Sequence, residues 1–446
     1  MTAFSPHSLA AAAKLLAEDF RARIADIAYV RKGILCSEML FFAVCVRTCN
    51  LRRILESARA RGRCSQERNV ALLRAIWEGF AQRFLRRREK QTSSTHIVPG
   101  EVATILIIQV SRIGDTLLST PTIRAIAAAF PAAAITCLGH PKRAEVLQHL
   151  PFLQRVGSIT KRSAPWRDRW GGKHYDLAFV FGYDLALVRY ALRIAKKTVA
   201  FRQQDAAINA RLFHIAKEPE FQSRHALFMQ YALIEKLGIA LVGKRLSYRI
   251  IEAEAAWARE ALRQRCGKHD ALPAPLIGVQ VASFPTKGYR DWPIEHFAQL
   301  CDRIREHYPK AHFVILGGKL EHLRTRFLHS HLLDCSTHLA GNLSLRQSAA
   351  IMGNLDLYIG VDTGPTHIMG ALNRPMVVLY HPYSPSRMLA PLDHPCLYAV
   401  DHPRVAQNCG PETSMAEVPV SLVWSQVQRA LTQGCPQTVV AEAGNA

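Results

Sequence analysis

An aspartate that follows an apolar segment is the first residue of this sequence that suggests chemistry. Ile105–Pro131 begins as a predicted buried strand, passes through a tight loop ending at Gly114 and Asp115, and continues as a helix of small residues. A carboxylate held at such a point can take a proton from a substrate hydroxyl. The alternative is that Asp115 only caps the helix, a frequent role of aspartate. Taken alone, this stretch favours the capping role.

A second stretch has the same order of strand, polar glycine loop and helix. It is Leu355–Leu372, and its loop reads Gly-Val-Asp-Thr-Gly-Pro-Thr-His from Gly360 to His367. The proline suits the first helical turn, and Asp362 or Thr363 can cap it. Free amides at a helix N-terminus, reinforced by the helix dipole, form a natural pocket for a diphosphate. His367 can donate to the same phosphates, although a single histidine in a helix more often only packs.

The surrounding elements must bring these two loops together. From Val102 onwards strands and helices alternate, which is typical of doubly wound parallel sheets. The predicted strands of the first round are 103–110, 134–138 and 177–181, followed by a helix-rich stretch to Leu237. Those of the second round are 276–281, 312–316, 355–360 and 376–380, with a helix over Ile294–His307 among them. Two such units in tandem place a ligand crevice between the carboxyl ends of both sheets.

The length and charge of the chain divide it further. Its 446 residues exceed what one hydrophobic core usually serves. Residues 1–98 carry a net charge of +10 out of +22 and read as helices over 8–29, 33–59 and 67–90, followed by a linker near residues 91–100. The last helix has one apolar face and one basic face. It either packs on the main body or lies on an anionic membrane surface. The predicted domains are 1–98, 99–270 and 271–446.

Several other classes of protein are disfavoured by missing patterns. The loop after the first strand has one glycine, so the G-x-G-x-x-G of a dinucleotide-binding dehydrogenase is absent, as is a phosphate-binding P-loop. The eleven cysteines contain no C-x-x-C pair and are expected to be free thiols; Cys396, Cys409 and Cys435 lie close enough in sequence to keep a metal site as a minor alternative. No segment reads as a membrane span or a signal peptide, so we expect a cytoplasmic protein.

The motifs together resemble a known family. The segments that carry the resemblance are Ser111–Pro121, Ile123–Ala125, Phe130–Pro131, Ala144–Leu147, Asp291–Pro293 with Phe297, Leu316–Gly318, Leu339–Gly341, Asp362–His367 and Pro375–Tyr380 with Ser384–Pro385. They resemble, in order and spacing over about residues 101–432, the ADP-heptose:lipopolysaccharide heptosyltransferases, which are family nine glycosyltransferases. Residues 1–98 are outside the resemblance.

The resemblance implies a GT-B fold, in which two Rossmann-like doubly wound domains face a central cleft, here with an all-helical N-terminal extension. It also implies an inverting transfer of heptose from ADP-heptose to a lipopolysaccharide inner-core sugar, with no metal and no cofactor. By motif match Asp115 is the general base, and the acceptor side or its loop includes Ser111, Arg112, Gly114 and Thr120. The implied donor-binding residues are Lys287, Arg290, Asp362, Thr363, Gly364, Pro365, Thr366 and His367.

Two departures from the family pattern concern the donor site. The loop Val281–Lys287 lacks the glycine of the family's Pro-Gly-Ala-Ser-like segment. Arg290 stands where the family usually has a phosphate-facing lysine, and its planar fork differs from an ammonium group, so Lys287 is a second candidate for that role.

The expected partners follow from charge and resemblance. They are a nucleotide-sugar donor, an anionic lipopolysaccharide core acceptor and, as a hypothesis, the inner-membrane surface, reached through the basic N-terminal helices from the cytoplasmic face. Alternatives are a family member with another nucleotide-sugar or a protein acceptor, and a non-catalytic sugar-nucleotide binder. Nucleic-acid binding ranks last because no nucleic-acid-binding motif accompanies the charge.

Overall fold

A computed structural model describes residues 97–168, 172–217, 219–220, 224–266, 273–407 and 409–433. Apart from Ile97, all of them belong to one compact unit, Val98–Ala446. The basic helices and most of the linker predicted near the N-terminus lie outside the described residues. Within the described part of the chain, no helix combines the length and the apolar character that a membrane span requires.

The first half of this unit is a parallel sheet of six strands. Its spatial order is β3 (Arg155–Ser158), β2 (Ala134–Gly139), β1 (Thr104–Gln109), β4 (Tyr175–Phe181), β5 (Ala195–Phe201) and β6 (His214–Ala216). The chain order reverses between β1 and β4. Ligands of doubly wound sheets bind at the carboxyl ends of the strands beside such a reversal, which here includes the loop that carries Asp115.

The second half repeats the arrangement with the same relative strand order. Its sheet runs β12 (Leu397–Asp401), β11 (Met376–Tyr380), β10 (Leu357–Val361), β7 (Leu276–Gln280), β8 (His312–Leu316) and β9 (Ser336–His338), again all parallel. The reversal lies between β7 and β10. The loops after these two strands carry Arg290 and Asp362, so the predicted donor residues gather at the expected edge.

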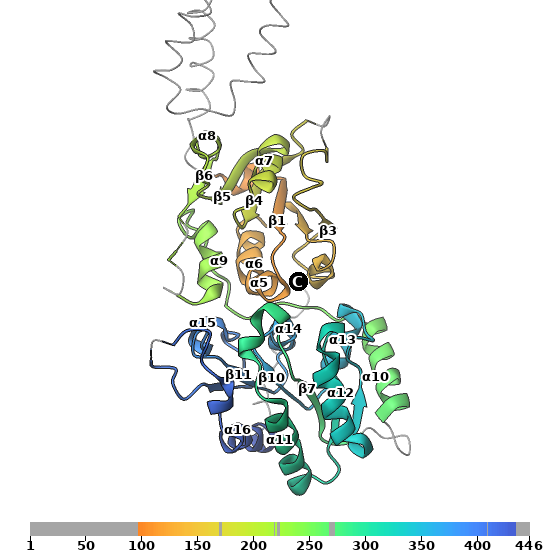
Figure 1. The fold of residues 1–446 in the computed structure, drawn as a ribbon. Helices are drawn as coiled ribbons and strands as arrows, with labels where there is room; N and C mark the ends of the chain where they lie inside the picture. Colours follow the sequence, from red (N-terminus) through yellow and green to blue (C-terminus); the bar gives the residue numbers. More distant parts are fainter. Residues whose placement is uncertain are drawn as a thin grey trace, which may run out of the picture. The chain divides into compact units, whose positions relative to one another are not determined.

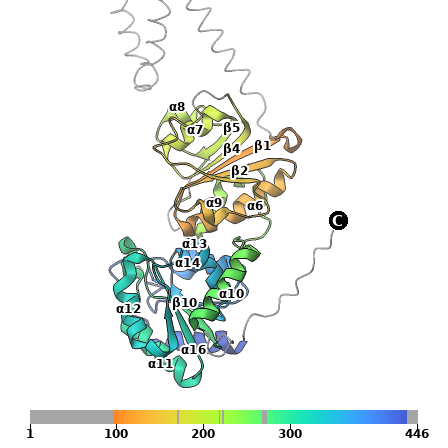
Figure 2. The ribbon, with the colours of Figure 1, turned by 90° about the vertical axis from the view of Figure 1, so that its right-hand side faces the viewer.

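Helices cover both faces of each sheet (Figures 1 and 2). The helices of the first half are α5 (Ile113–Leu118), α6 (Thr120–Ala129), α7 (Leu185–Ile194), α8 (Ala206–Asn209) and α9 (Ala226–Glu235). Those of the second half are α10 (Glu252–Cys266), α11 (Ile294–His307), α12 (His322–His331), α13 (Leu345–Met352), α14 (Gly364–Leu372), α15 (Ser386–Leu389) and α16 (Val420–Gln433). Short 3-10 segments are η2 (Pro99–Glu101), η3 (Ala144–Leu147), η4 (Pro285–Arg290), η5 (Lys319–Glu321), η6 (Leu333–Cys335) and η7 (Met415–Glu417).

The central strands are buried on both faces, which explains their unbroken apolar sequences. Residues 105–108 of β1 have no exposed surface. In the second half, α11, α12 and α16 pack on one face of the sheet. On the other face α10, α13 and α14 share an apolar cluster with Leu117 and Leu118 of α5, Val146 of η3 and Leu227 of α9. The two halves are therefore joined by a continuous apolar core at α5.

Helix α10 precedes the second sheet in the chain but contacts α13 and β9 of that sheet (Figure 1). The predicted boundary at residue 270 separates it from these partners. The hydrophobic effect explains its position, because its buried residues Ala258, Leu262 and Cys266 join the apolar cluster of the second half.

Two sequence-based expectations need correction. The stretch predicted to be rich in helix after Phe181 also contains β5 and β6. The sequence pattern did not indicate β5 because this strand follows α7 without a loop and has two lysines directly after its first residue, although Val199–Phe201 is buried. Among the cysteines, Cys137, Cys266, Cys301, Cys335 and Cys409 are free thiols as expected, whereas Cys396 is disulfide-bonded.

Candidate active site

The loop after β1 delivers Asp115 to the first turn of α5. Arg112 is the N-cap residue, and the helix has no side-chain capping bond. Asp115 therefore does not perform the capping role that the sequence left open. Its half-buried carboxylate accepts no hydrogen bond from the described residues, so its oxygens are free to meet a ligand. The hydroxyl of Thr116 donates instead to the carbonyl of Arg112 over 2.8 Å and holds the loop closed.

The environment of Asp115 favours its protonated form. Burial raises the pKa of this carboxyl above its ordinary value, and the neighbouring Asp362 adds to the rise. His367, Arg112 and Arg290 act in the opposite direction without cancelling it. A carboxylate with a raised pKa is a stronger proton acceptor than an ordinary aspartate, which suits a general base.

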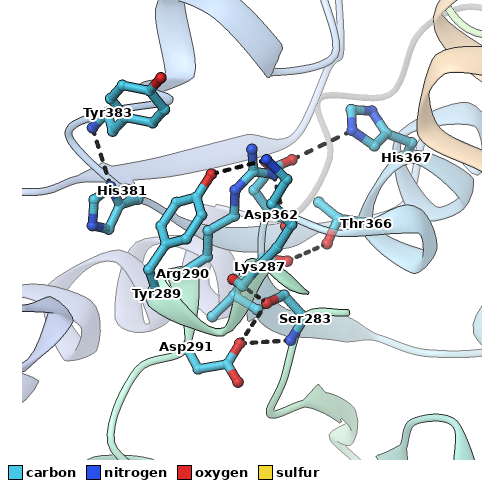
Figure 3. A network of polar contacts seen from close by, with 11 residues as sticks. Ser283, Lys287, Tyr289, Arg290, Asp291, Asp362, Thr366, His367, His381 and Tyr383 are labelled. Carbon is cyan, nitrogen blue, oxygen red and sulfur yellow. Dashed lines mark hydrogen bonds and ion pairs between the residues drawn. The ribbon is translucent and has the colours of Figure 1, made fainter. Parts of the chain in front are cut away.

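The loop after β10 places a second carboxylate, Asp362, opposite the first. Only 2 % of this residue is exposed. One carboxylate oxygen of Asp362 forms a close ion pair with Arg290. The other oxygen lies 3.3 Å from Nε2 of His367, but this contact lacks the alignment of a full hydrogen bond. Figure 3 shows Arg290 and His367 both pointing towards Asp362. Burial alone would raise the pKa of Asp362, but His367 and Arg290 hold it below its ordinary value.

Helix α14 begins directly after this carboxylate. Thr363 is its N-cap, with extended backbone and no side-chain capping bond, and Gly364, Pro365 and Thr366 form the first turn. The hydroxyl of Thr366 donates to the carbonyl of Val361 over 2.6 Å and is buried (Figure 3). Its side chain is therefore committed to the loop. This turn can therefore offer a ligand its backbone N–H groups and the positive end of the helix dipole.

The loop after β7 supplies the cations. The amide and hydroxyl of Ser283 both donate to Asp291, over 2.6 and 2.7 Å, and the hydroxyl also contacts the carbonyl of Lys287 over 2.6 Å. These bonds close the loop around η4 (Figure 3). Nζ of Lys287 lies 3.5 Å from the hydroxyl of Tyr289, whereas Arg290 reaches Asp362. Both predicted cations thus remain near the site, and Arg290 is the one that is held by a carboxylate.

Several buried polar atoms of this cluster have no hydrogen-bond partner among the described residues. They are Nε of Arg290, Oδ1 of Asp362 and Nδ1 of His367. Unsatisfied buried polar atoms are unfavourable, and in native proteins they are commonly completed by water or by a ligand. The arrangement is therefore suited to a polar, anionic ligand.

Close packing of two glycines brings the two loops together. A Cβ on Gly114 would lie 2.7 Å from Cδ2 of His367, and a Cβ on Gly364 would lie 3.2 Å from Cβ of Ile113. Helices α5 and α14 contact each other at this point (Figure 1). A Cβ at Gly114 would require a shift of the His367 ring or of the helices, whereas a Cβ at Gly364 would be tight but would need a shift of only a few tenths of an ångström, so Gly114 contributes more to the close approach of the two loops.

One predicted acceptor residue, Thr120, has its side chain committed to bonds within the fold. Thr120 is fully buried, donates to the carbonyl of Leu117 over 2.6 Å and accepts from the amide of Ser247 over 2.9 Å. It anchors α6 to the segment between the halves. The amide of Ser111 donates to the side chain of Gln109 over 3.3 Å. Arg112 is exposed and lies 5.7 Å from the ring of Phe284 in the second half.

The sequence patterns did not single out two residues near the loop that carries Arg112 and Asp115. Phe284 is 55 % exposed and faces Arg112. Arg143, in the loop after β2, has a buried Nε without a partner; burial and Arg112 lower its pKa, and Asp115 acts against that shift. The sequence signal for Arg143 was its position after β2, because the carboxyl end of β2 lies beside the carboxyl end of β1.

The described residues contain no group of three or more histidine, cysteine, aspartate or glutamate side chains placed to bind a metal ion. The minor metal-site alternative involved Cys435, which lies outside the described residues.

Two doubly wound parallel sheets of six strands in tandem, each flanked by helices, are the arrangement of a GT-B fold. The chain matches glycosyltransferase family 9 (heptosyltransferase) over residues 171–416, which is more than half of its length. It belongs to this family.

Individual relatives agree in sequence and fold. Lipopolysaccharide heptosyltransferase 2 of Salmonella typhimurium is 24% identical over 314 residues, covering 65% of this chain and 86% of the relative. A family 9 glycosyltransferase from Veillonella parvula superposes with a TM-score of 0.64 at 19% identity, covering 76% of this chain and 100% of that structure. The ADP-heptose lipopolysaccharide heptosyltransferase II of E. coli gives 0.59 at 18% identity, covering 74% and 99%.

Proposed function

We propose that this protein transfers heptose from ADP-heptose to a sugar of the lipopolysaccharide inner core with inversion at the anomeric carbon. The observation that carries the proposal is the carboxylate of Asp115, which is half-buried and free of hydrogen bonds, next to the cluster of Arg290, Asp362 and His367. The donor and acceptor classes come from the relatives, whose names specify ADP-heptose and lipopolysaccharide.

Asp115 acts as the general base in this proposal. The acceptor hydroxyl gives its proton to the Asp115 carboxylate while its oxygen attacks the anomeric carbon. The bond between that carbon and the diphosphate oxygen breaks, and ADP leaves with the bonding electrons. Since attack and departure occur on opposite faces of the sugar, the anomeric configuration is inverted.

The second half stabilises the leaving group. Negative charge develops on the diphosphate as the bond breaks, and catalysis requires donors and cations that are already in place. The first turn of α14 offers amides and the positive end of a helix dipole. Arg290 and Lys287 add positive charge, and Asp362 keeps Arg290 and His367 oriented. With charge supplied in this way we expect transfer to continue after treatment with EDTA.

The acceptor and the surface that presents it are expected to be anionic. The net charge of +22 favours such partners, and +10 of it lies in residues 1–98. We infer that this segment, which lies outside the described residues except for its last two, brings the enzyme to acidic lipid headgroups. Binding to vesicles that contain acidic lipid should then weaken with added salt and with deletion of residues 1–90.

The decisive experiment measures ADP release from ADP-heptose with a panel of truncated core acceptors. Asp115→Ala should reduce acceptor-dependent release by about 10²–10⁴-fold. Its affinity for ADP-heptose, measured by calorimetry, should stay within about threefold, because the donor contacts proposed here lie in the second half. NMR of the product should show inverted anomeric configuration.

Asp334→Ala is the matched control, since Asp334 is an exposed aspartate of the second half. It should leave both measurements unchanged. Full activity of Asp115→Ala would refute the assigned base, and equal loss of turnover and donor binding would place Asp115 in the donor site instead. Tight donor binding without release on any acceptor would favour the non-catalytic binder.

A further inference from the structure

Arg346 is a buried cation outside the site described above. It is the second residue of α13, whose N-terminus is held by a capping box in which Gln347 N–H donates to Ser344 over 3.1 Å and Ser344 N–H donates to Gln347 over 2.9 Å. Only 7 % of Arg346 is exposed. A charge at such a depth normally has partners that compensate for lost hydration, and its partners reveal what it connects.

The guanidinium of Arg346 uses four hydrogen bonds on three different parts of the chain. It donates twice to the carboxylate of Glu254 in α10, over 2.6 and 2.5 Å. It donates to the carbonyl of Arg249, in the segment between α9 and α10, over 2.7 Å. It also donates to the carbonyl of Glu145 in η3 of the first half, over 3.2 Å. The ring of Tyr248 lies 5.0 Å from the guanidinium carbon.

These partners place Arg346 at the junction of the two halves. Glu145 belongs to the first half, Arg249 to the connecting segment, and α10 and α13 to the second half. A rigid planar fork with five N–H groups can hold such divergent acceptors at once, which a lysine ammonium on a flexible stem cannot do with the same geometry.

The junction is linked to the candidate active site by direct packing. Segment η3 contacts both α13 and α5, and α14 contacts both α13 and α5. The four elements therefore form a closed ring. Asp115 lies on α5 and His367 on α14, whereas the bond from Arg346 to Glu145 ties α13 to η3 on the other side of the ring.

We propose that Arg346 is a positioning residue that sets the orientation of Asp115 relative to the donor cluster. This role rests on the proposed transfer reaction for its catalytic consequence. A displacement of about 1 Å between reacting groups can reduce a rate about 10²-fold. Loss of the hydrogen bond between Arg346 and Glu145 is therefore expected to lower kcat.

The test compares Arg346→Lys and Arg346→Met with the wild-type enzyme in full-length protein. Lysine keeps a positive charge beside Glu254 but cannot bridge three acceptors, so Arg346→Lys should retain the thermal stability of the wild type within a few degrees. Its kcat should nevertheless fall about 10–100-fold, while calorimetric affinity for ADP stays within about twofold. Arg346→Met should show the same loss of kcat together with lower stability.

Arg259→Met is the control, because Arg259 forms an exposed pair with Glu252 over 2.6 Å on the same helix, α10, without reaching the first half. It should leave kcat unchanged. A kcat of Arg346→Lys equal to that of the wild type would overturn the proposal. A decrease in kcat that is explained entirely by a smaller fraction of folded protein would also overturn it.

Hydrogen exchange separates this proposal from the proposed reaction. In Arg346→Lys the backbone amide hydrogens of η3 and of residues 245–251 are expected to exchange faster than in the wild type, whether or not the wild-type enzyme transfers heptose. Unchanged exchange there would overturn the positioning role. Absence of transfer by the wild type, with faster exchange in the variant, would instead refute the reaction and leave Arg346 as the tie between the halves.

Discussion

Two neighbouring carboxyl groups in this protein are driven in opposite directions by their surroundings. Asp115 is half-buried and makes no hydrogen bond with a described residue, so desolvation dominates and its pKa rises. Asp362 is more deeply buried, yet His367 and Arg290 lie against it and lower its pKa. Carboxyl groups separated in this way commonly divide their roles, one handling protons and the other holding charge. This difference supports the proposal that Asp115 accepts the proton and that Asp362 orients the cations.

The pH dependence of the reaction should report the raised pKa of Asp115. Since the base must be ionised, kcat/KM should fall as the pH drops through this pKa, at a higher pH than an ordinary aspartate with a pKa of 3.8 would give. The measurement is kcat/KM from pH 4 to 9 at constant ionic strength. An acid limb at or below the ordinary value would contradict the assignment.

The same shift predicts an effect on stability. A folded-state pKa above the unfolded value means that folding is favoured by protonation at low pH, and that this contribution is lost as the pH rises through the folded-state value. Ionised Asp115 thus destabilises the protein at neutral pH. Asp115→Asn should therefore unfold at a higher temperature than the wild type at pH 7.5, and the difference should shrink towards pH 4.

At the scale of elements, the site depends on how closely α5 and α14 approach. Both helices begin immediately after the carboxyl end of a strand, and both present a glycine to the other helix. The contact of Gly114 with the ring of His367 is the closest of these, because a Cβ there would meet Cδ2 at 2.7 Å. The loops are thus positioned by helix packing.

Gly114→Ala should consequently separate the two helices. We expect a loss of about 1–3 kcal/mol in the free energy of unfolding, which is typical of overpacking, and a fall in kcat of at least about tenfold. Urea unfolding and ADP release measure the two effects. Gly100→Ala is the control, since no heavy atom lies within 4 Å of a Cβ at that position. Wild-type kcat in Gly114→Ala would show that the helices have room to spare.

The molecule as a whole couples its halves through an apolar core. Leu117, Leu118 and Val146 of the first half belong to the same buried cluster as α10, α13 and α14 of the second. Arg346 adds polar ties at the edge of that cluster. Because unfolding of either half would expose part of a shared core, the described halves should unfold in one transition.

Donor binding should stabilise that single transition. At a concentration about 100 times its Kd, ADP should raise the free energy of unfolding by about 2.7 kcal/mol. Arg290→Met should weaken ADP binding about tenfold and so reduce this gain by about 1.3 kcal/mol at the same ADP concentration. Chemical denaturation with and without ADP measures both. If ADP stabilised Arg290→Met as much as the wild type, Arg290 would not bind the diphosphate. Arg303→Met, a substitution on α11, is the control.

The amino-acid sequence by itself was sufficient to predict the strands that have unbroken apolar runs and the helices that have a strong amphipathic pattern. The predicted bounds of β8, β11 and α11 agree with the structure, because burial on both faces or an amphipathic repeat is a local property of the chain. Asp115 and the loop from Asp362 to His367 were predicted as site residues because each follows such a strand and matches a motif of the family; their roles stay a prediction.

Only the tertiary structure decided the features that depend on neighbours distant in the chain. Strand β5 is recognisable by its pairing with β4 and β6, Thr120 accepts a bond from Ser247 in the segment between the halves, and α10 packs in the half that follows it. Arg346 reaches Glu145 across 201 positions of sequence. The sequence determines which segments are buried and which loops follow strands, whereas contacts between loops arise from the packing of whole elements, which no local pattern encodes.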